Sequence, residues 1–79
     1  MTYYTYIIRC SDGTLYTGWT DDIEKRLDAH NKGIGSRYTR ARLPVELIHK
    51  EELKSKIEAM RRERAIKKMT RAAKLSLIG

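Results

Sequence analysis

With 79 residues, of which 41% are hydrophobic, the chain is long enough for one domain with a thin core, residues 1–79, and too apolar for a disordered tail. Seventeen Lys and Arg against ten Asp and Glu give a net charge of +7, and such a positive field attracts polyanions, most commonly nucleic acid. The single cysteine excludes an internal disulfide, and no apolar run approaches the ~20 residues that cross a bilayer, so we expect a monomeric cytoplasmic protein without a membrane partner.

Two strands are expected first, over residues 3–10 (YYTYIIRC) and 14–19 (TLYTGW), because both segments are rich in aromatic and β-branched residues. The Ser-Asp-Gly sequence at 11–13 between them is a strong hairpin signal. The N-terminal third of the chain is therefore expected to be a β-hairpin.

The hairpin loop has two possible geometries. A two-residue turn would pair Tyr6 with Trp19 and put Tyr6 and Tyr16 on opposite faces of the sheet. A three-residue loop, with Gly13 as a left-handed bulge, would pair Tyr6 with Gly18. The two tyrosines would then share a face. The sequence permits both geometries.

A helix is expected over residues 22–32, with Asp21 as its cap, Glu24 as the reciprocal capping partner and Gly33 as its stop. Residues 34–43 (IGSRYTRARL) follow as a basic loop with room for one helical turn.

A third strand is expected over residues 45–50, and a long helix should begin near Ser55, where Ser55 and Glu58 form a capping box. It should run to about Lys68, and a short helix from about Thr70 ends the chain. The order β-β-α-β-α-α predicts an α+β fold, with a three-stranded antiparallel sheet flanked by helices.

The first helix places polar side chains where apolar ones are expected. Ile23 and Leu27 mark its buried side, and at ~100° per residue His30 falls only about 20° from Ile23 and Arg26 about 60° from it. A lone histidine on such a face is more often a hydrogen-bonded core residue. An arginine there can cover the edge of the core with its stem.

A carboxylate occupies a similar position in the long helix. Ala59, Met60 and Ile66 define the expected apolar side, and Glu63 lies inside that arc. Burying it alone would be costly, so it must be paired, bound to a metal or exposed in a cleft. Lys67, four residues on, is available as an ordinary ion-pair partner.

Together, such side chains suit phosphodiester chemistry. The planar fork of an arginine matches two phosphate oxygens. A single carboxylate can hold one Mg²⁺ or Mn²⁺ that keeps most of its waters and also binds the phosphate. A tyrosine close to such a cation can act as a base, and His30 could assist proton transfer or bind phosphate.

The hairpin resembles the two halves of the GIY-YIG nuclease motif, at residues 4–6 (YTY) and 16–18 (YTG). The first half departs from the motif, with Tyr4 at its Gly and Thr5 at its Ile, and Thr17 occupies the middle of the second half. The resemblance covers essentially the whole chain and looks closest to small stand-alone bacterial proteins of this family. It implies a catalytic set of Tyr6, Tyr16, Arg26 and His30, with Gly18 as a structural motif residue.

The resemblance implies a metal-dependent endonuclease that hydrolyses phosphodiester bonds in DNA. A tyrosine would activate water, Arg26 would steady the phosphate, and Glu63 would hold one Mg²⁺ or Mn²⁺, with Glu58 as the rival metal residue. We expect structure-selective or weakly sequence-specific cleavage, because the targeting domains of larger relatives are absent. A partner protein could supply targeting.

The basic loop is a candidate nucleic-acid-binding segment. Arg37, Arg40 and Arg42 could track a phosphate backbone, and Tyr38 could stack on a base. The alternative is a solvated loop. Lys67 is a further candidate for phosphate contact. Two other functions compete with a nuclease, namely a non-catalytic nucleic-acid-binding module and a small protein-interaction domain.

Overall fold

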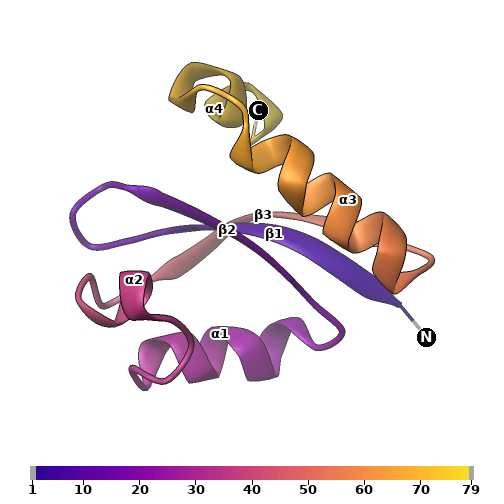
Figure 1. Ribbon diagram of the computed structural model, residues 1–79. Helices are drawn as coiled ribbons and strands as arrows, with labels where there is room; N and C mark the ends of the chain where they lie inside the picture. The colour runs from indigo at the N-terminus through magenta and orange to yellow at the C-terminus, as the bar shows by residue number, and fades with distance from the viewer. Residues whose placement is uncertain (1, 79) are drawn as a thin grey trace.

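The computed structural model describes residues 2–78 and confirms the α+β class (Figure 1). The sheet has three antiparallel strands in the order β2-β1-β3. Helices α1 and α2 lie on one side of it and α3 on the other (Figure 1). The elements are β1 (Tyr3–Arg9), β2 (Leu15–Thr20), α1 (Ile23–Asn31), α2 (Arg37–Arg40), β3 (Glu46–Leu53), α3 (Lys56–Lys67) and α4 (Arg71–Ile78). The expected order is confirmed, and α2 is the single helical turn for which the basic loop had room. No helix between residues 2 and 78 has the length and apolarity that a membrane span requires.

The hairpin adopts the three-residue loop. Tyr6 pairs with Gly18, as that geometry requires. The N–H of Gly13 donates to the carbonyl of Cys10 at 3.0 Å, and Gly13 has a φ of +83°, the left-handed conformation that glycine tolerates best. Tyr6 and Tyr16 therefore project from the same face of the sheet.

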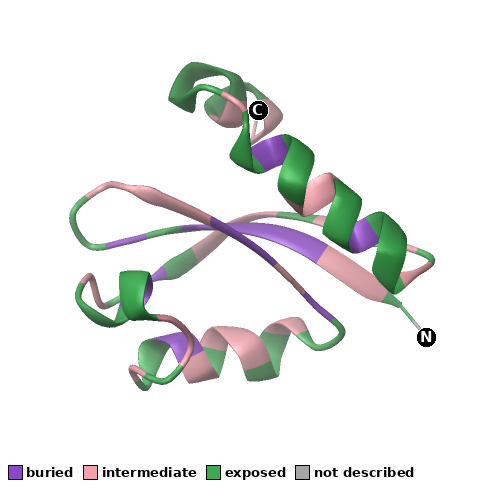
Figure 2. Cartoon of the chain, in the orientation of Figure 1, coloured by how far each residue is buried: buried purple, intermediate pink, exposed green. Residues whose placement is uncertain are grey.

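The two faces of β1 pack against different helices. Tyr6 and Ile8 belong to the apolar cluster under α1, whereas Thr5 on the opposite face donates a hydrogen bond of 2.8 Å to the carbonyl of Ala59 in α3. Ile7 and Ile8 are both fully buried. Figure 2 shows this buried stretch crossing the middle of the sheet, whereas most residues of α3 are exposed. The thin core thus centres on β1, with helices held to both of its faces.

The predicted cap of the first helix was wrong by one residue. Asp22, not Asp21, accepts from the backbone N–H of Lys25 at 3.0 Å, so the helix begins at Ile23. The N–H of Asp22 donates in turn to the hydroxyl of Thr20 at 3.1 Å. This second contact orients Asp22 as the cap and leaves Asp21 exposed.

The third strand is longer than predicted and ends at Leu53 rather than at residue 50. Glu51 and Glu52 continue the pairing with β1 although acidic residues are uncommon in strands. Arg62 of α3 binds both carboxylate oxygens of Glu51, at 2.6 and 3.0 Å, which compensates the charge and holds α3 on the sheet.

The expected start of the long helix is confirmed, because the Ser55 hydroxyl accepts from the N–H of Glu58 at 3.1 Å. Its predicted apolar face was partly wrong. Ala59 and Ile66 are fully buried, but Met60 is 39% exposed. Met60 lies about 100° around the helix from Ala59, which is too far for it to face the sheet.

Candidate active site

An open cavity of about 330 Å³ lies beside the edge strand β2. Its walls come from the hairpin, α1 and α3, and the lining residues are Tyr6, Tyr16, Gly18, Trp19, Thr20, Asp21, Arg26 and Glu63. Four of the five residues expected to form one site therefore meet here. The fifth, His30, is fully buried and contacts Tyr6.

The position of Tyr6 depends on the glycine opposite it. A Cβ atom built on Gly18 would lie 2.4 Å from the Tyr6 hydroxyl oxygen and 2.6 Å from Cζ. The tyrosine ring thus passes directly over the backbone of β2 and reaches the cavity beyond it. Gly18 is required here because any side chain would occupy the space of the ring.

The Tyr6 hydroxyl has two protein partners. It lies 3.0 Å from Nε2 of His30 and receives a hydrogen bond of 3.4 Å from Nε of Arg26. Arginine can only donate, so the tyrosine proton is free to be given to Nε2 of His30. The imidazole proton then belongs on Nδ1, which lies 2.8 Å from the hydroxyl of Thr39.

Burial keeps this pair neutral. Desolvation, reinforced by the charge of Arg26, lowers the pKa of His30 to about 4, so the imidazole is uncharged at pH 7. Burial also raises the pKa of Tyr6, although the hydrogen bond from Arg26 opposes that shift. The pKa of Arg26 is itself raised, chiefly by its hydrogen bond to Tyr6 and also by Tyr16. Among Tyr6, Arg26 and His30, the guanidinium of Arg26 is thus the charged group at neutral pH.

Residues before and within α2 complete the support of His30, and they were not among the site residues predicted from the sequence. A Cβ atom on Gly35 would lie 2.3 Å from Nδ1 of His30, and the Gly35 carbonyl accepts from Nη2 of Arg26 at 3.1 Å. Thr39 is fully buried, and its hydroxyl lies 2.9 Å from that of Ser36. The spacing of Ser36 and Thr39 is that of a helix cap and its third residue, which is the signal that could have revealed them.

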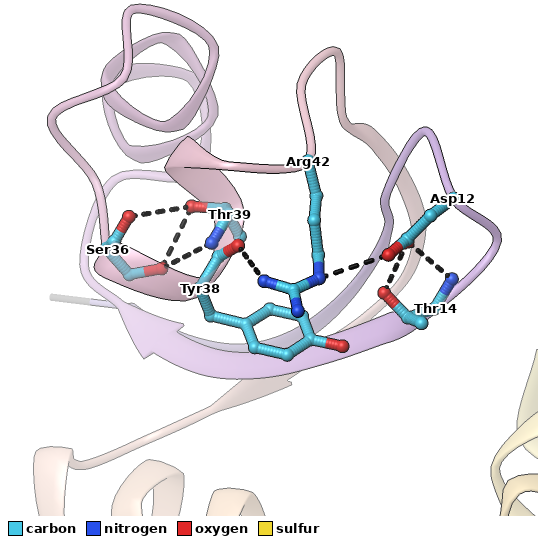
Figure 3. A network of polar contacts seen from close by, with 6 residues as sticks. All are labelled: Asp12, Thr14, Ser36, Tyr38, Thr39 and Arg42. Atoms are coloured by element: carbon cyan, nitrogen blue, oxygen red, sulfur yellow. Dashed lines mark hydrogen bonds and ion pairs between the residues drawn. The ribbon is translucent and has the colours of Figure 1, made fainter.

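The second tyrosine is held by a stack of side chains. The Tyr16 ring meets His30 edge-on at 5.4 Å and stacks with Tyr38 at 6.0 Å. The Arg42 guanidinium lies 3.9 Å from the centre of the Tyr38 ring and bonds Asp12 at 3.1 Å (Figure 3). Nucleic-acid contacts by Tyr38 and Arg42 would therefore compete with contacts inside the chain.

The remaining candidates for nucleic-acid contact lie at the surface. Arg37 and Arg40 are exposed on α2. Lys67 is half exposed, with its ammonium 3.8 Å from Glu63 and 5.9 Å from the centre of the Tyr16 ring. Because Glu63 and Tyr16 both line the cavity, Lys67 lies at its border. From this position its ammonium can contact a bound anion.

Glu63 is the carboxylate of α3 that faces the cavity. Its side chain is 23% exposed, and the long contact to Lys67 leaves oxygen lone pairs free. Within residues 2–78 no three His, Cys, Asp or Glu side chains form a metal-binding group. A single carboxylate facing the cavity is the kind of donor that suits Mg²⁺, because this ion takes few protein ligands and completes its shell with water and phosphate. Glu58 accepts from the N–H of Lys54 at the start of α3 and does not line the cavity.

The GIY-YIG catalytic domain matches this chain over residues 2–76. A UPF0213 protein of Streptococcus agalactiae is 57% identical over 75 residues, which cover 95% of this chain and 85% of that protein. A UPF0213 protein of Halobacterium salinarum is 53% identical over 75 residues, covering 95% and 97%. The solution NMR structure of a UPF0213 protein from Bacillus halodurans is 42% identical, has a TM-score of 0.63, and covers 99% of this chain and 83% of its own.

Proposed function

Because this chain belongs to the GIY-YIG catalytic domain family, we propose that it is a divalent-metal-dependent endonuclease that hydrolyses phosphodiester bonds in DNA. The observation that supports this most is the meeting of Tyr6, Tyr16, Arg26 and Glu63 in one cavity. Each of these four side chains is ordinary in isolation. Their convergence combines a phosphate-binding cation, a metal-binding carboxylate and two phenols.

Arg26 binds the phosphate in this proposal. Its Nε and Nη2 groups are already held by Tyr6 and by the Gly35 carbonyl, which fix the guanidinium at the cavity wall. A fixed cation stabilises the charge that develops on the phosphate without reorganising during the reaction. The neutral state of His30 also matters, because it leaves Arg26 as the charged group behind the phosphate.

Tyr16 is the better candidate for the group that takes a proton from water. The Tyr6 hydroxyl is occupied by His30 and Arg26, whereas the half-buried Tyr16 lines the cavity. The ammonium of Lys67 lies 5.9 Å from the centre of the Tyr16 ring and adds a cation beside this residue. Tyr6 and His30 then act by positioning Arg26.

The residues facing the cavity suit a single metal ion. Glu63 would hold Mg²⁺ or Mn²⁺, which would offset the charge on the phosphate and on the departing oxygen. Thr5 is a positioning residue for this carboxylate, because its hydrogen bond to Ala59 fixes α3 one turn before Glu63. The motif position where Thr5 replaces the family's Ile thus has a structural role in this chain.

The decisive experiment incubates the purified protein with duplex, single-stranded, flap and branched DNA and with RNA, in Mg²⁺ or Mn²⁺. We expect cleavage of one or more DNA substrates, with structure preferred over sequence. Glu63→Ala and Arg26→Ala should each reduce the rate by at least about 100-fold. Glu58→Ala is the matched control, because this carboxylate lies on the same helix outside the cavity, and it should retain activity. Cleavage that survives both Glu63→Ala and Arg26→Ala would refute the proposed mechanism, and binding without cleavage would favour a non-catalytic module.

A further inference from the structure

Trp19 lines the same cavity as Arg26 and Glu63, although the proposed reaction gives it no role. Its ring is half-buried, and it projects from the edge strand β2. Nζ of Lys56, the first residue of α3, lies 5.4 Å from the centre of the indole ring. The aromatic ring of a cavity-lining residue therefore has a cation beside it.

The cavity is larger than a phosphate group requires. Its volume of about 330 Å³ falls within the range of pockets that enclose small organic ligands. Its walls also differ in chemistry. Arg26 and Glu63 are suited to the phosphate and its counter-ion, whereas Trp19 offers an aromatic ring that neither a phosphate nor a metal ion needs.

The helix α3 repeats this arrangement at its two ends. Lys56 lies over Trp19, and Lys67 lies over Tyr16 at 5.9 Å, with Glu63 between the two lysines along the helix. Aromatic rings beside cations are the features that bind single-stranded nucleic acid, where bases stack and phosphates are neutralised.

We propose that Trp19 and Lys56 form a base-binding subsite next to the phosphate held by Arg26. The indole ring stacks on one unpaired base, and Lys56 contacts the adjoining phosphate. The substrate class is then nucleic acid with unpaired nucleotides at the cleavage point, such as single strands, flaps or loops. A base inside a duplex is already stacked on both faces and must first be extruded at the cost of its pairing and stacking. The inference rests on the proposed function only for the position of the phosphate.

Trp19 is the only tryptophan in the chain, so its fluorescence reports directly on the subsite. The wild-type protein would be titrated, in EDTA to prevent cleavage, with a thymidine oligonucleotide of roughly 12 nucleotides. The matched probes are an abasic oligonucleotide of the same length and a blunt-ended duplex. We expect strong quenching by the thymidine strand and little by the abasic strand or the duplex. Equal quenching by the thymidine and abasic strands would overturn the proposal.

Variants test the same point by anisotropy of a labelled thymidine strand. Trp19→Leu should weaken binding by about 5- to 100-fold, whereas Trp19→Phe should keep most of the affinity because it keeps a ring. Tyr4→Leu is the control, because Tyr4 also has a lysine, Lys50, 5.7 Å from its ring but does not line the cavity. Unchanged binding by Trp19→Leu would refute the subsite.

The two proposals fail in different ways. If thymidine strands quench Trp19 and Trp19→Leu binds weakly, but no substrate is cleaved in Mg²⁺ or Mn²⁺, the subsite stands and the hydrolase proposal fails. If single strands are cleaved without quenching and Trp19→Leu cleaves them as well as the wild type does, the hydrolase stands and the subsite fails.

Discussion

The hydroxyl of Tyr6 lies 3.0 Å from Nε2 of His30, so two residues that are 24 positions apart form a buried polar pair between the sheet and α1. The pair is neutral, because burial lowers the pKa of His30 and raises that of Tyr6. Its hydrogen bonds extend to Arg26 at the cavity and to Thr39 in α2. The pair thus links the cavity wall to the fully buried part of the domain.

Gly18→Ala should displace Tyr6, since the new methyl group would fall 2.4 Å from the hydroxyl oxygen. We expect a loss of about 1–3 kcal/mol in the free energy of unfolding, measured by urea denaturation, together with a loss of cleavage. Gly13→Ala is the control. It has φ of +83° but open space around it, so it should cost about 1 kcal/mol and leave cleavage intact. A Gly18→Ala protein as stable as the wild type would contradict this packing.

Thr39→Val should leave Nδ1 of His30 without its partner at 2.8 Å. We expect destabilisation of about 1–3 kcal/mol and a shift of the imidazole proton away from Nδ1, visible in the ¹⁵N chemical shifts of the ring. Thr39→Ser retains the hydroxyl and should restore the wild-type tautomer. If Val and Ser give the same imidazole spectrum, Thr39 does not set the tautomer.

The protein should lose stability on mild acidification because of His30. Its pKa is about 4 when folded and about 6.5 when unfolded, so the unfolded chain binds more protons between these values. The free energy of unfolding should therefore fall as pH drops from about 6.5 towards 4, by up to about 3 kcal/mol. Denaturation at several pH values would measure this slope. His30→Gln should remove this part of the slope and His49→Gln, on the other edge strand, should keep it. A slope unaffected by His30→Gln would be evidence against a neutral buried imidazole.

Arg62→Ala should loosen α3 from the sheet, because Arg62 holds Glu51 through two hydrogen bonds of 2.6 and 3.0 Å. We expect a loss of about 1–3 kcal/mol in the free energy of unfolding. Lys32→Ala is the matched control, since it removes an exposed pair with Asp28 that should contribute less than about 1 kcal/mol. Similar losses in the two variants would mean that the Glu51 pair is no stronger than a surface pair.

The sequence by itself determined the element order, the hairpin and the family. The aromatic and β-branched composition of the strands and the capping residues of the helices are local signals, so the strands, the helices and the Ser55 cap could be predicted from short segments alone. Local signals failed where a contact from outside the element decides the outcome. The strand β3 extends through Glu51 because Arg62 compensates its charge, and Asp22 is the cap because Thr20 holds its N–H.

Only the tertiary structure decided between the two hairpin geometries and so brought Tyr6 and Tyr16 to one face. It also revealed the contacts of Gly35 and Thr39 with His30, and the position of Trp19 at the cavity wall. The physical reason is common to all of them. Each depends on contacts between different elements or loops, which periodicity within a single element cannot specify.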